Sequence, residues 1–246
     1  MMKRLRLISL LAVLTFPAIC LAQTDKESED HYTGNLGAGL SMTRGNTDTT
    51  NFNVSGELTY DPKTKNVMKF EGLYLRANSN DEDTADKLSL GFRDDYSFSK
   101  RVSVYGAMGY LRDPFKDISY LLNPQGGIGY KPVMTERTKL SLNAGGGTVW
   151  EKNPGIDVQN SATLNAGQNF SLQISENAKF TQNFSGLWKT SNFSDALYHF
   201  GVALVTSITS RSEVKFEFID DYKNVTPNPD IKKNDTAFIV SFLYKI

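Results

Sequence analysis

From residue 34 to the C-terminus, apolar and polar side chains alternate with a period of two through one short segment after another. This period is typical of β-strands whose two faces meet different surroundings. No segment carries a sustained helical period. The pattern predicts twelve strands, at about 34–43, 49–60, 66–76, 85–97, 102–111, 117–130, 138–150, 159–172, 178–189, 195–208, 212–223 and 235–246.

The last segment alternates most regularly, with Phe238, Val240, Phe242 and Tyr244 on one face. An apolar edge strand of this kind would aggregate unless its edge were paired and its apolar face covered. A closed transmembrane barrel meets both conditions, because lipid covers the apolar face. The segment also resembles the C-terminal strand of bacterial outer-membrane barrels, which implies recognition by the barrel assembly machinery, although the chain ends in Ile246 and not in Phe.

The polar face of the predicted strands carries amides, hydroxyls and charges of both signs, so it cannot be the core of a soluble barrel. We expect it to line a lumen in which mixed signs give at most weak ion selectivity. The candidate lumen-lining residues are Glu57, Lys69, Glu71, Lys87, Arg93, Lys139, Lys179, His199, Glu213, Lys215 and Glu217. Gly127, Gly129, Gly145 and Gly147 share this face and leave room for water or for a long neighbouring side chain.

Aromatic residues gather near the ends of the apolar face, where the two interfaces of a bilayer would lie. The predicted interface aromatics are Tyr60, Tyr96, Tyr110, Tyr130, Trp150, Trp188, Tyr198, Tyr222 and Tyr244. Four polar residues interrupt the apolar face. Asp94 and Asp220 lie close to an interface Tyr, at headgroup depth. For Gln168 and Gln182 the pattern predicts a bulge that shifts the register.

The N-terminus has the features of a secretory signal: Lys3, Arg4 and Arg6, an apolar run too short to span a bilayer as a helix, and Ala22 before a polar stretch. We expect a signal peptide over residues 1–22, a polar periplasmic tail over 23–32 and the barrel over 33–246. Cys20 leaves a lipoprotein alternative open. It is the single cysteine of the chain, so the mature chain can form no disulfide.

Charge argues against nucleic acid as a partner. Removal of the signal leaves 24 of the 27 basic residues against 27 acidic ones, a formal net charge of −3. Beyond the signal no apolar run approaches the roughly 20 residues of a membrane helix. The fold predicted is therefore an all-β, antiparallel up-and-down transmembrane barrel of about twelve strands.

An even number of strands places both termini on one side, which we expect to be the periplasm. The predicted outer loops are 44–48, 77–84, 112–116, 151–158, 190–194 and 224–234. The predicted inner turns are 61–65, 99–101, 131–137, 173–177 and 209–211. The run Asp81, Glu82 and Asp83 is expected to be a solvated loop tip rather than a calcium site.

The opening hairpin, Gly37 to Thr47, and the Asn-rich strand Asn51 to Tyr60 resemble the salt-induced outer-membrane protein family (YdiY-like). Its most specific motif is the turn Arg44-Gly45-Asn46-Thr47. Gly-Asn suits a tight hairpin turn, so the motif indicates topology and not a binding site. The resemblance implies an outer-membrane barrel and supplies no catalytic residues.

Candidate catalytic groups are few, because the chain has only His31 and His199. A barrel hydrolase needs a base close to its nucleophile or acid, and Ser207 lies too far along the strand of His199. We therefore expect no enzyme, no cofactor and no metal. The sequence favours a monomeric barrel in the outer-membrane lipids that passes small solutes or ions weakly, or serves the envelope under osmotic stress. The alternatives are a barrel enzyme acting on lipid or peptide at the rim, and a soluble carrier barrel.

Overall fold

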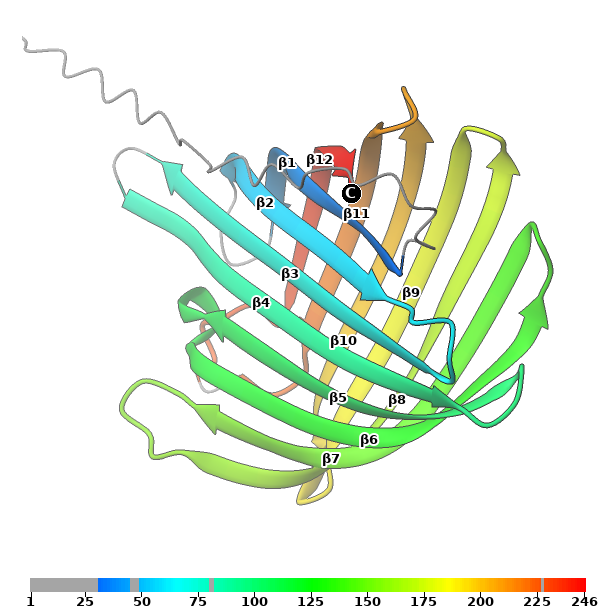
Figure 1. The fold of residues 1–246 in the computed structure, drawn as a ribbon. Helices are drawn as coiled ribbons and strands as arrows, with labels where there is room; N and C mark the ends of the chain where they lie inside the picture. Colours follow the sequence, from blue (N-terminus) through cyan, green and yellow to red (C-terminus); the bar gives the residue numbers. More distant parts are fainter. Residues whose placement is uncertain (1–30, 45–48, 80–81, 227) are drawn as a thin grey trace, which may run out of the picture. The chain divides into compact units, whose positions relative to one another are not determined.

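The structure, a computed structural model, describes residues 31–44, 49–79, 82–226 and 228–246 of the chain. These residues form twelve strands and one short 3-10 helix (Figure 1). The elements are β1 (Tyr32–Arg44), β2 (Thr49–Tyr60), β3 (Asn66–Ser79), β4 (Glu82–Ser97), β5 (Val102–Asp113), η1 (Pro114–Lys116), β6 (Ile118–Met134), β7 (Thr138–Lys152), β8 (Gln159–Ser175), β9 (Ala178–Lys189), β10 (Asn192–Ser207), β11 (Ser212–Lys223) and β12 (Asn234–Lys245).

The strands form one closed antiparallel barrel in which each strand pairs with its neighbours in the chain. The barrel closes where β1 pairs with β12, from Asn35 opposite Lys245 to Arg44 opposite Thr236. This confirms the predicted fold class. Within the described residues, no helix is long and apolar enough to cross a membrane.

Strand boundaries differ from the prediction mainly by extension. β6 continues to Met134, past a register shift between Tyr130 and Val133. Pro132 lies inside that shift, where a residue without an N–H group interrupts no ladder bond. β3 runs to Ser79 and β4 starts at Glu82, so most of the predicted loop 77–84 is strand; Asp81 lies outside the described residues.

The barrel has two ends that differ in their connections. The terminal end holds the start of β1 and the end of β12, and short turns join its strands. The loop end holds η1 and the longer connections 153–158 and 224–233. We use these two names below.

The two faces of the wall are chemically distinct. Large apolar side chains point outward and are exposed, among them Leu36, Phe70, Leu90, Met108, Ile128, Leu164, Phe216 and Phe242. Because the side chains of a strand alternate, the intervening positions point into the barrel. The buried residues include many of these inward positions.

The predicted bulge at Gln168 and Gln182 is wrong. β8 and β9 pair in unbroken register from Thr163 to Gln173, and Gln168 Nε2 donates a hydrogen bond of 2.8 Å to Gln182 Oε1. The two amides therefore satisfy part of each other's hydrogen-bonding capacity on the outer face. Asp94 is compensated similarly by Asn66, whose Nδ2 lies 3.2 Å from Asp94 Oδ2.

Candidate functional site

The barrel encloses a cavity of about 660 Å³. Its wall includes Lys69 and Glu71 toward the terminal end and Lys87 and Asp113 toward the loop end. The cavity thus runs along the lumen, and its chemistry changes along that direction.

At the loop end a lysine crosses the lumen. Lys116, in η1 between β5 and β6, has its Nζ 3.2 Å from the carbonyl oxygen of Asp221 and 3.3 Å from Asp235 Oδ2. Asp221 and Asp235 belong to β11 and β12, which lie six places from β5 and β6 in the circular strand order. Lys116 therefore bridges opposite walls, and its side chain is only 7% exposed. We call this bridge the latch.

Two further side chains, Lys87 and His199, converge on the latch. Lys87 of β4 forms an ion pair with the carboxylate of Asp221. His199 of β10 lies with Nδ1 2.7 Å from the other oxygen of the same carboxylate. A carboxylate only accepts, so Nδ1 carries the proton and Nε2 is left as an acceptor in the neutral ring. Asp221 thus connects its own strand, β11, to β4 through Lys87 and to β10 through His199.

A second ionic group lies deeper in the protein at the loop end. The side chain of Glu151 is 3% exposed and forms ion pairs with Lys223, also 3% exposed, and with Lys189 at 2.8 Å. Lys189 pairs in addition with Asp195 at 2.7 Å, and Asn153 donates a hydrogen bond of 3.1 Å to Glu151. Buried charges are tolerated only when partners and hydrogen bonds compensate their lost hydration. The group therefore ties β7, β9, β10 and β11 together.

Apolar side chains complete the closure of the loop end. One inward cluster joins Leu73 and Leu75 to Ile219, Ala237 and Ile239. Another joins Leu111, Ile118, Leu121, Val149 and Leu197, and so brings β10 against β5, β6 and β7. Ile118 is fully buried and Ile239 is 1% exposed. The inner face is thus polar toward the terminal end, whereas at the loop end apolar clusters lie beside the ionic groups.

Midway along the lumen a tyrosine occupies the predicted glycine patch. A Cβ atom added at Gly127 would lie 2.8 Å from Cε1 of Tyr105, and one at Gly145 would lie 2.7 Å from its hydroxyl oxygen. The Tyr105 hydroxyl donates a hydrogen bond of 2.6 Å to Asn165 Oδ1. The expectation that these glycines admit a long neighbouring side chain is confirmed.

Arg93 lies on the lumen side of this tyrosine. Its guanidinium carbon is 3.8 Å from the centroid of the Tyr105 ring, a cation–π geometry. Two hydrogen bonds of 2.7 and 2.8 Å join the guanidinium to Asp95, two residues along the same strand. Such a bidentate pair fixes the orientation of the planar group. Arg93 is therefore a rigid, charge-compensated group inside the cavity.

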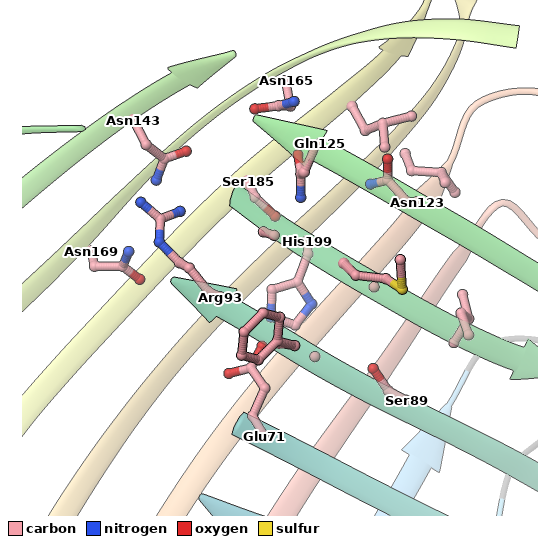
Figure 2. Close-up of a pocket in the computed structure, with 18 of the residues that line it drawn as sticks. Glu71, Ser89, Arg93, Asn123, Gln125, Asn143, Asn165, Asn169, Ser185 and His199 are labelled. Carbon is pink, nitrogen blue, oxygen red and sulfur yellow. The ribbon is translucent and has the colours of Figure 1, made fainter. Parts of the chain in front are cut away.

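Amide side chains of β6, β7 and β8 face the cavity across from the strand of Arg93 (Figure 2). We call this surface the amide wall; it consists of Asn123, Gln125, Asn143, Asn165 and Asn169. Figure 2 shows Arg93 pointing toward Asn143 and Asn169. The amide wall was not predicted as a group, because its members are far apart in the sequence. They are connected only by their positions on the inward face of three successive strands.

The structure places the candidate lumen residues in two groups. Lys69, Glu71, Lys87, Arg93 and His199 line the cavity. The others occupy inward positions of the same parity, where Lys215 pairs with Glu217 at 2.8 Å and Glu213 with Lys245 at 3.1 Å. This second group is Glu57, Lys139, Lys179, Glu213, Lys215 and Glu217.

Sequence reasoning missed the latch and the buried ionic group. Lys116 and Glu151 fell in predicted loops, where charged residues are ordinarily solvated. When the alternation of inward and outward positions is followed along their own strands, Glu151 and Lys223 both fall on the inward side. This alternation is the sequence signal that could have found the ionic group.

The predicted interface aromatics occupy outward positions, and several meet one another near the ends of the barrel. At the loop end Trp188 donates a hydrogen bond of 3.0 Å to the Tyr198 hydroxyl, and the Tyr198 and Tyr222 rings lie 6.1 Å apart. At the terminal end the Tyr32 and Tyr60 rings lie 4.7 Å apart. The aromatics therefore lie toward both ends of the apolar outer band.

One row of residues has the chemistry of a hydrolase. Ser185, His199 and Asp221 are cross-strand neighbours on β9, β10 and β11. The expectation considered only Ser207 and overlooked Ser185, whose proximity depends on strand pairing. The row faces the cavity, whereas the predicted enzyme alternative placed its chemistry at the rim. Among the described residues no group of three or more His, Cys, Asp or Glu side chains could hold a metal ion.

A closed antiparallel barrel with an apolar outer band and a charged interior is the architecture of outer-membrane barrels. Solved structures of that class share this fold. The NanC porin matches with a TM-score of 0.59 and 9% identity over 86% of this chain and all of its own. The translocator domain of the autotransporter NalP from Neisseria meningitidis matches with 0.55 and 9% identity over 89% of this chain and 90% of its own. An outer membrane channel from Pseudomonas putida F1 matches with 0.52 and 11% identity over 90% of this chain and all of its own.

The chain belongs to the family described as protein of unknown function, DUF481, whose family model matches residues 36–246. No curated protein matches its sequence.

Proposed function

We propose that the protein is a passive outer-membrane channel for small hydrophilic solutes, closed in this state by the latch. The observation that carries the proposal is the combination of an internal cavity of about 660 Å³ with a single connector lysine that bridges opposite walls above it. A porin and a channel with the same fold support the proposal.

The terminal end of the lumen has the character of a water-filled entrance. Glu57, Lys69, Lys139 and Lys179 occupy inward positions there and are exposed. Both signs are present on this part of the wall, where Lys215 pairs with Glu217 and Lys245 with Glu213, so small ions of either sign pass with little preference. Rings of one sign would be needed for strong selectivity.

The latch has the features of a gate. It rests on η1, a three-residue helix in the connector between β5 and β6, and not on a strand. Withdrawal of this connector would remove Lys116 from Asp221 and Asp235 without breaking the barrel ladder. Opening would also have to displace the apolar clusters, so a closed state is the stable one.

The setting of the barrel is part of the same proposal. The terminal end faces the periplasm, in keeping with short periplasmic turns in such barrels, and outer-membrane lipid covers the apolar band. A signal peptide over residues 1–22 directs export, β12 is read by the assembly machinery, and the barrel works as a monomer. The resemblance to the salt-induced family supports a role under osmotic stress.

Single-channel recording in a planar bilayer tests the proposal. Wild-type protein should be closed most of the time, whereas Lys116→Ala and Lys116→Met should show a higher open probability. Lys100→Ala, an exposed change in a terminal-end turn, is the matched control and should behave as wild type. Absence of conductance in both Lys116 variants, with a folded barrel, would refute the channel.

We propose further that the protein is not an enzyme. The row of Ser185, His199 and Asp221 favours a hydrolase as the second candidate, but Asp221 is already engaged by Lys87 and Lys116. A carboxylate that already pairs with Lys87 is less available to stabilise a protonated histidine. Assays against phospholipid, peptide and small ester substrates distinguish the two candidates.

A further inference from the structure

We infer that the cavity below the latch binds a neutral saccharide of about disaccharide size, held between the amide wall and the pair of Arg93 and Asp95. The inference rests on the proposed function and names the solute class that the channel would take. The cavity volume of about 660 Å³ lies within the range of about 300–1,000 Å³ that is usual for small-molecule sites.

The amide wall matches hydroxyl groups in kind. Each Asn or Gln side chain offers two N–H donors and a carbonyl acceptor, and each sugar hydroxyl both donates and accepts. Ser89, Ser141 and Ser185 add hydroxyls to the same cavity. A ligand that carries many hydroxyls therefore finds partners on several strands at once.

Two amide atoms of the wall are buried without a hydrogen-bond partner. Asn123 Oδ1 and Asn165 Nδ2 have no hydrogen-bond partner among the described residues, although each residue is only 9% exposed. Both residues line the cavity. Leaving a buried polar atom without a partner costs about 1–3 kcal/mol. Neither atom has surface open to the empty cavity, so a ligand hydroxyl can satisfy it only when a neighbouring side chain moves aside.

Asn165 is positioned for this role by its other atom. Its Oδ1 accepts the hydrogen bond of 2.6 Å from the Tyr105 hydroxyl, so the amide orientation is set and Nδ2 is the group that remains without a partner. The Tyr105 ring rests against Gly127 and Gly145. The amide therefore keeps its orientation before a ligand arrives, which lowers the entropic cost of binding.

The charges in the cavity argue for a neutral ligand. Arg93 is paired with Asp95, Lys87 with Asp221 and Lys116 with Asp235. These three cations are already compensated, so an acidic sugar would have to displace a carboxylate from one of them or reach Lys69, the cross-strand neighbour of Arg93. A neutral sugar needs no such exchange. It can also lie against the guanidinium plane of Arg93, whose side chain is 29% exposed.

Isothermal titration of the full-length protein, refolded in detergent, tests the inference. Maltose, sucrose and trehalose serve as neutral probes, with digalacturonate and glycylglycine as charged and zwitterionic comparisons. We expect at least one neutral disaccharide to bind at least tenfold more tightly than either comparison probe. Binding of only digalacturonate or glycylglycine would overturn the inference in favour of that ligand class.

Variants of the wall locate the site. Asn165→Leu and, independently of the Tyr105 hydrogen bond, Asn143→Leu and Gln125→Leu should weaken neutral disaccharide binding at least tenfold. Asn177→Leu, in an exposed turn at the terminal end, is the control and should change affinity less than twofold. Unchanged binding in both Asn143→Leu and Gln125→Leu would show that the sugar binds elsewhere.

The bilayer recording separates this inference from the proposed function. If Lys116→Ala conducts but no neutral disaccharide binds to wild-type protein, the saccharide site is refuted and the channel stands. If neither Lys116 variant conducts, the channel is refuted whatever the titration shows.

Discussion

The two ends of the lumen use the same residue types with different consequences. At the loop end Glu151, Lys189 and Lys223 have side chains at most 9% exposed and form one connected ionic group. At the terminal end Glu57, Lys69 and their neighbours face open space. Exposed pairs contribute about 0–1 kcal/mol, whereas removal of one member of a buried pair costs about 3–5 kcal/mol. Burial, and not the number of charges, decides which end closes the barrel.

Glu151→Ala should have the largest effect on stability, because it leaves Lys189 and Lys223 buried without their shared carboxylate. We expect a loss of about 3–5 kcal/mol in the free energy of unfolding. Glu57→Ala, a matched change at the terminal end, should cost less than about 1 kcal/mol. Urea titrations of both variants in lipid vesicles measure the difference. Equal losses would remove the distinction between the two ends.

Both ends belong to one lumen, and the barrel wall separates this lumen from lipid. Arginine substitutions on the two faces of the wall test this arrangement. Val240→Arg, on the outward face of β12 between Phe238 and Phe242, should destabilise the barrel by about 2–4 kcal/mol. Thr181→Arg, at an inward position of β9, should cost much less because its charge remains in water. Folding titrations into vesicles compare the two. A greater loss for Thr181→Arg would invert the assignment of the faces.

Between the two ends, Tyr105 joins the wall to Arg93. Tyr105→Phe removes the hydrogen bond to Asn165 and should cost about 0.5–1.5 kcal/mol. It should also raise the conductance noise, since Arg93 keeps its aromatic neighbour while Asn165 is no longer fixed. Denaturant titration beside bilayer recording measures both quantities. A Tyr105→Phe variant with wild-type stability would mean that this hydrogen bond does not stabilise the barrel.

His199→Gln should have the smallest effect. Glutamine retains a hydrogen-bond donor for Asp221, which Lys87 and Lys116 continue to neutralise, so stability and conductance should be close to those of wild type. A catalytic His199 would instead make the change cost at least about 10²-fold in rate. Any turnover of phospholipid, peptide or ester by wild-type protein that disappears in the variant would assign the loop end to catalysis.

The sequence predicts the strands well because period-two alternation is a local property. All twelve strands, their order and the parity of positions such as Lys87 and Arg93 follow from it. Contacts across the lumen do not. The partner of Lys116 lies 105 residues away, and which opposite wall it reaches depends on how the closed barrel staggers its strands.

The alternation also does not reveal how the polarity of one face changes along a strand. The inward positions of β7 pass from Lys139 and Asn143 through Gly147 and Val149 to Glu151, so one face changes from hydrated groups to apolar packing and then to a buried ion pair. A description of each face by its average composition misses this gradient. The pair of Gln168 and Gln182 was misread for a related reason, because their compensation comes from the neighbouring strand.

The seam between β1 and β12 has a consequence for how the protein is made. Its first pairs join residues near 35 to residues near 245, so almost the whole chain must be delivered before the last backbone hydrogen bonds can form. Contacts of such long sequence separation form slowly, because the entropy of closing the ring must be overcome first. Until then both seam strands present unpaired edges. Removal of either seam strand would leave its partner with an unpaired edge, so we expect a truncation at β1 or β12 to abolish the closed barrel rather than shorten it.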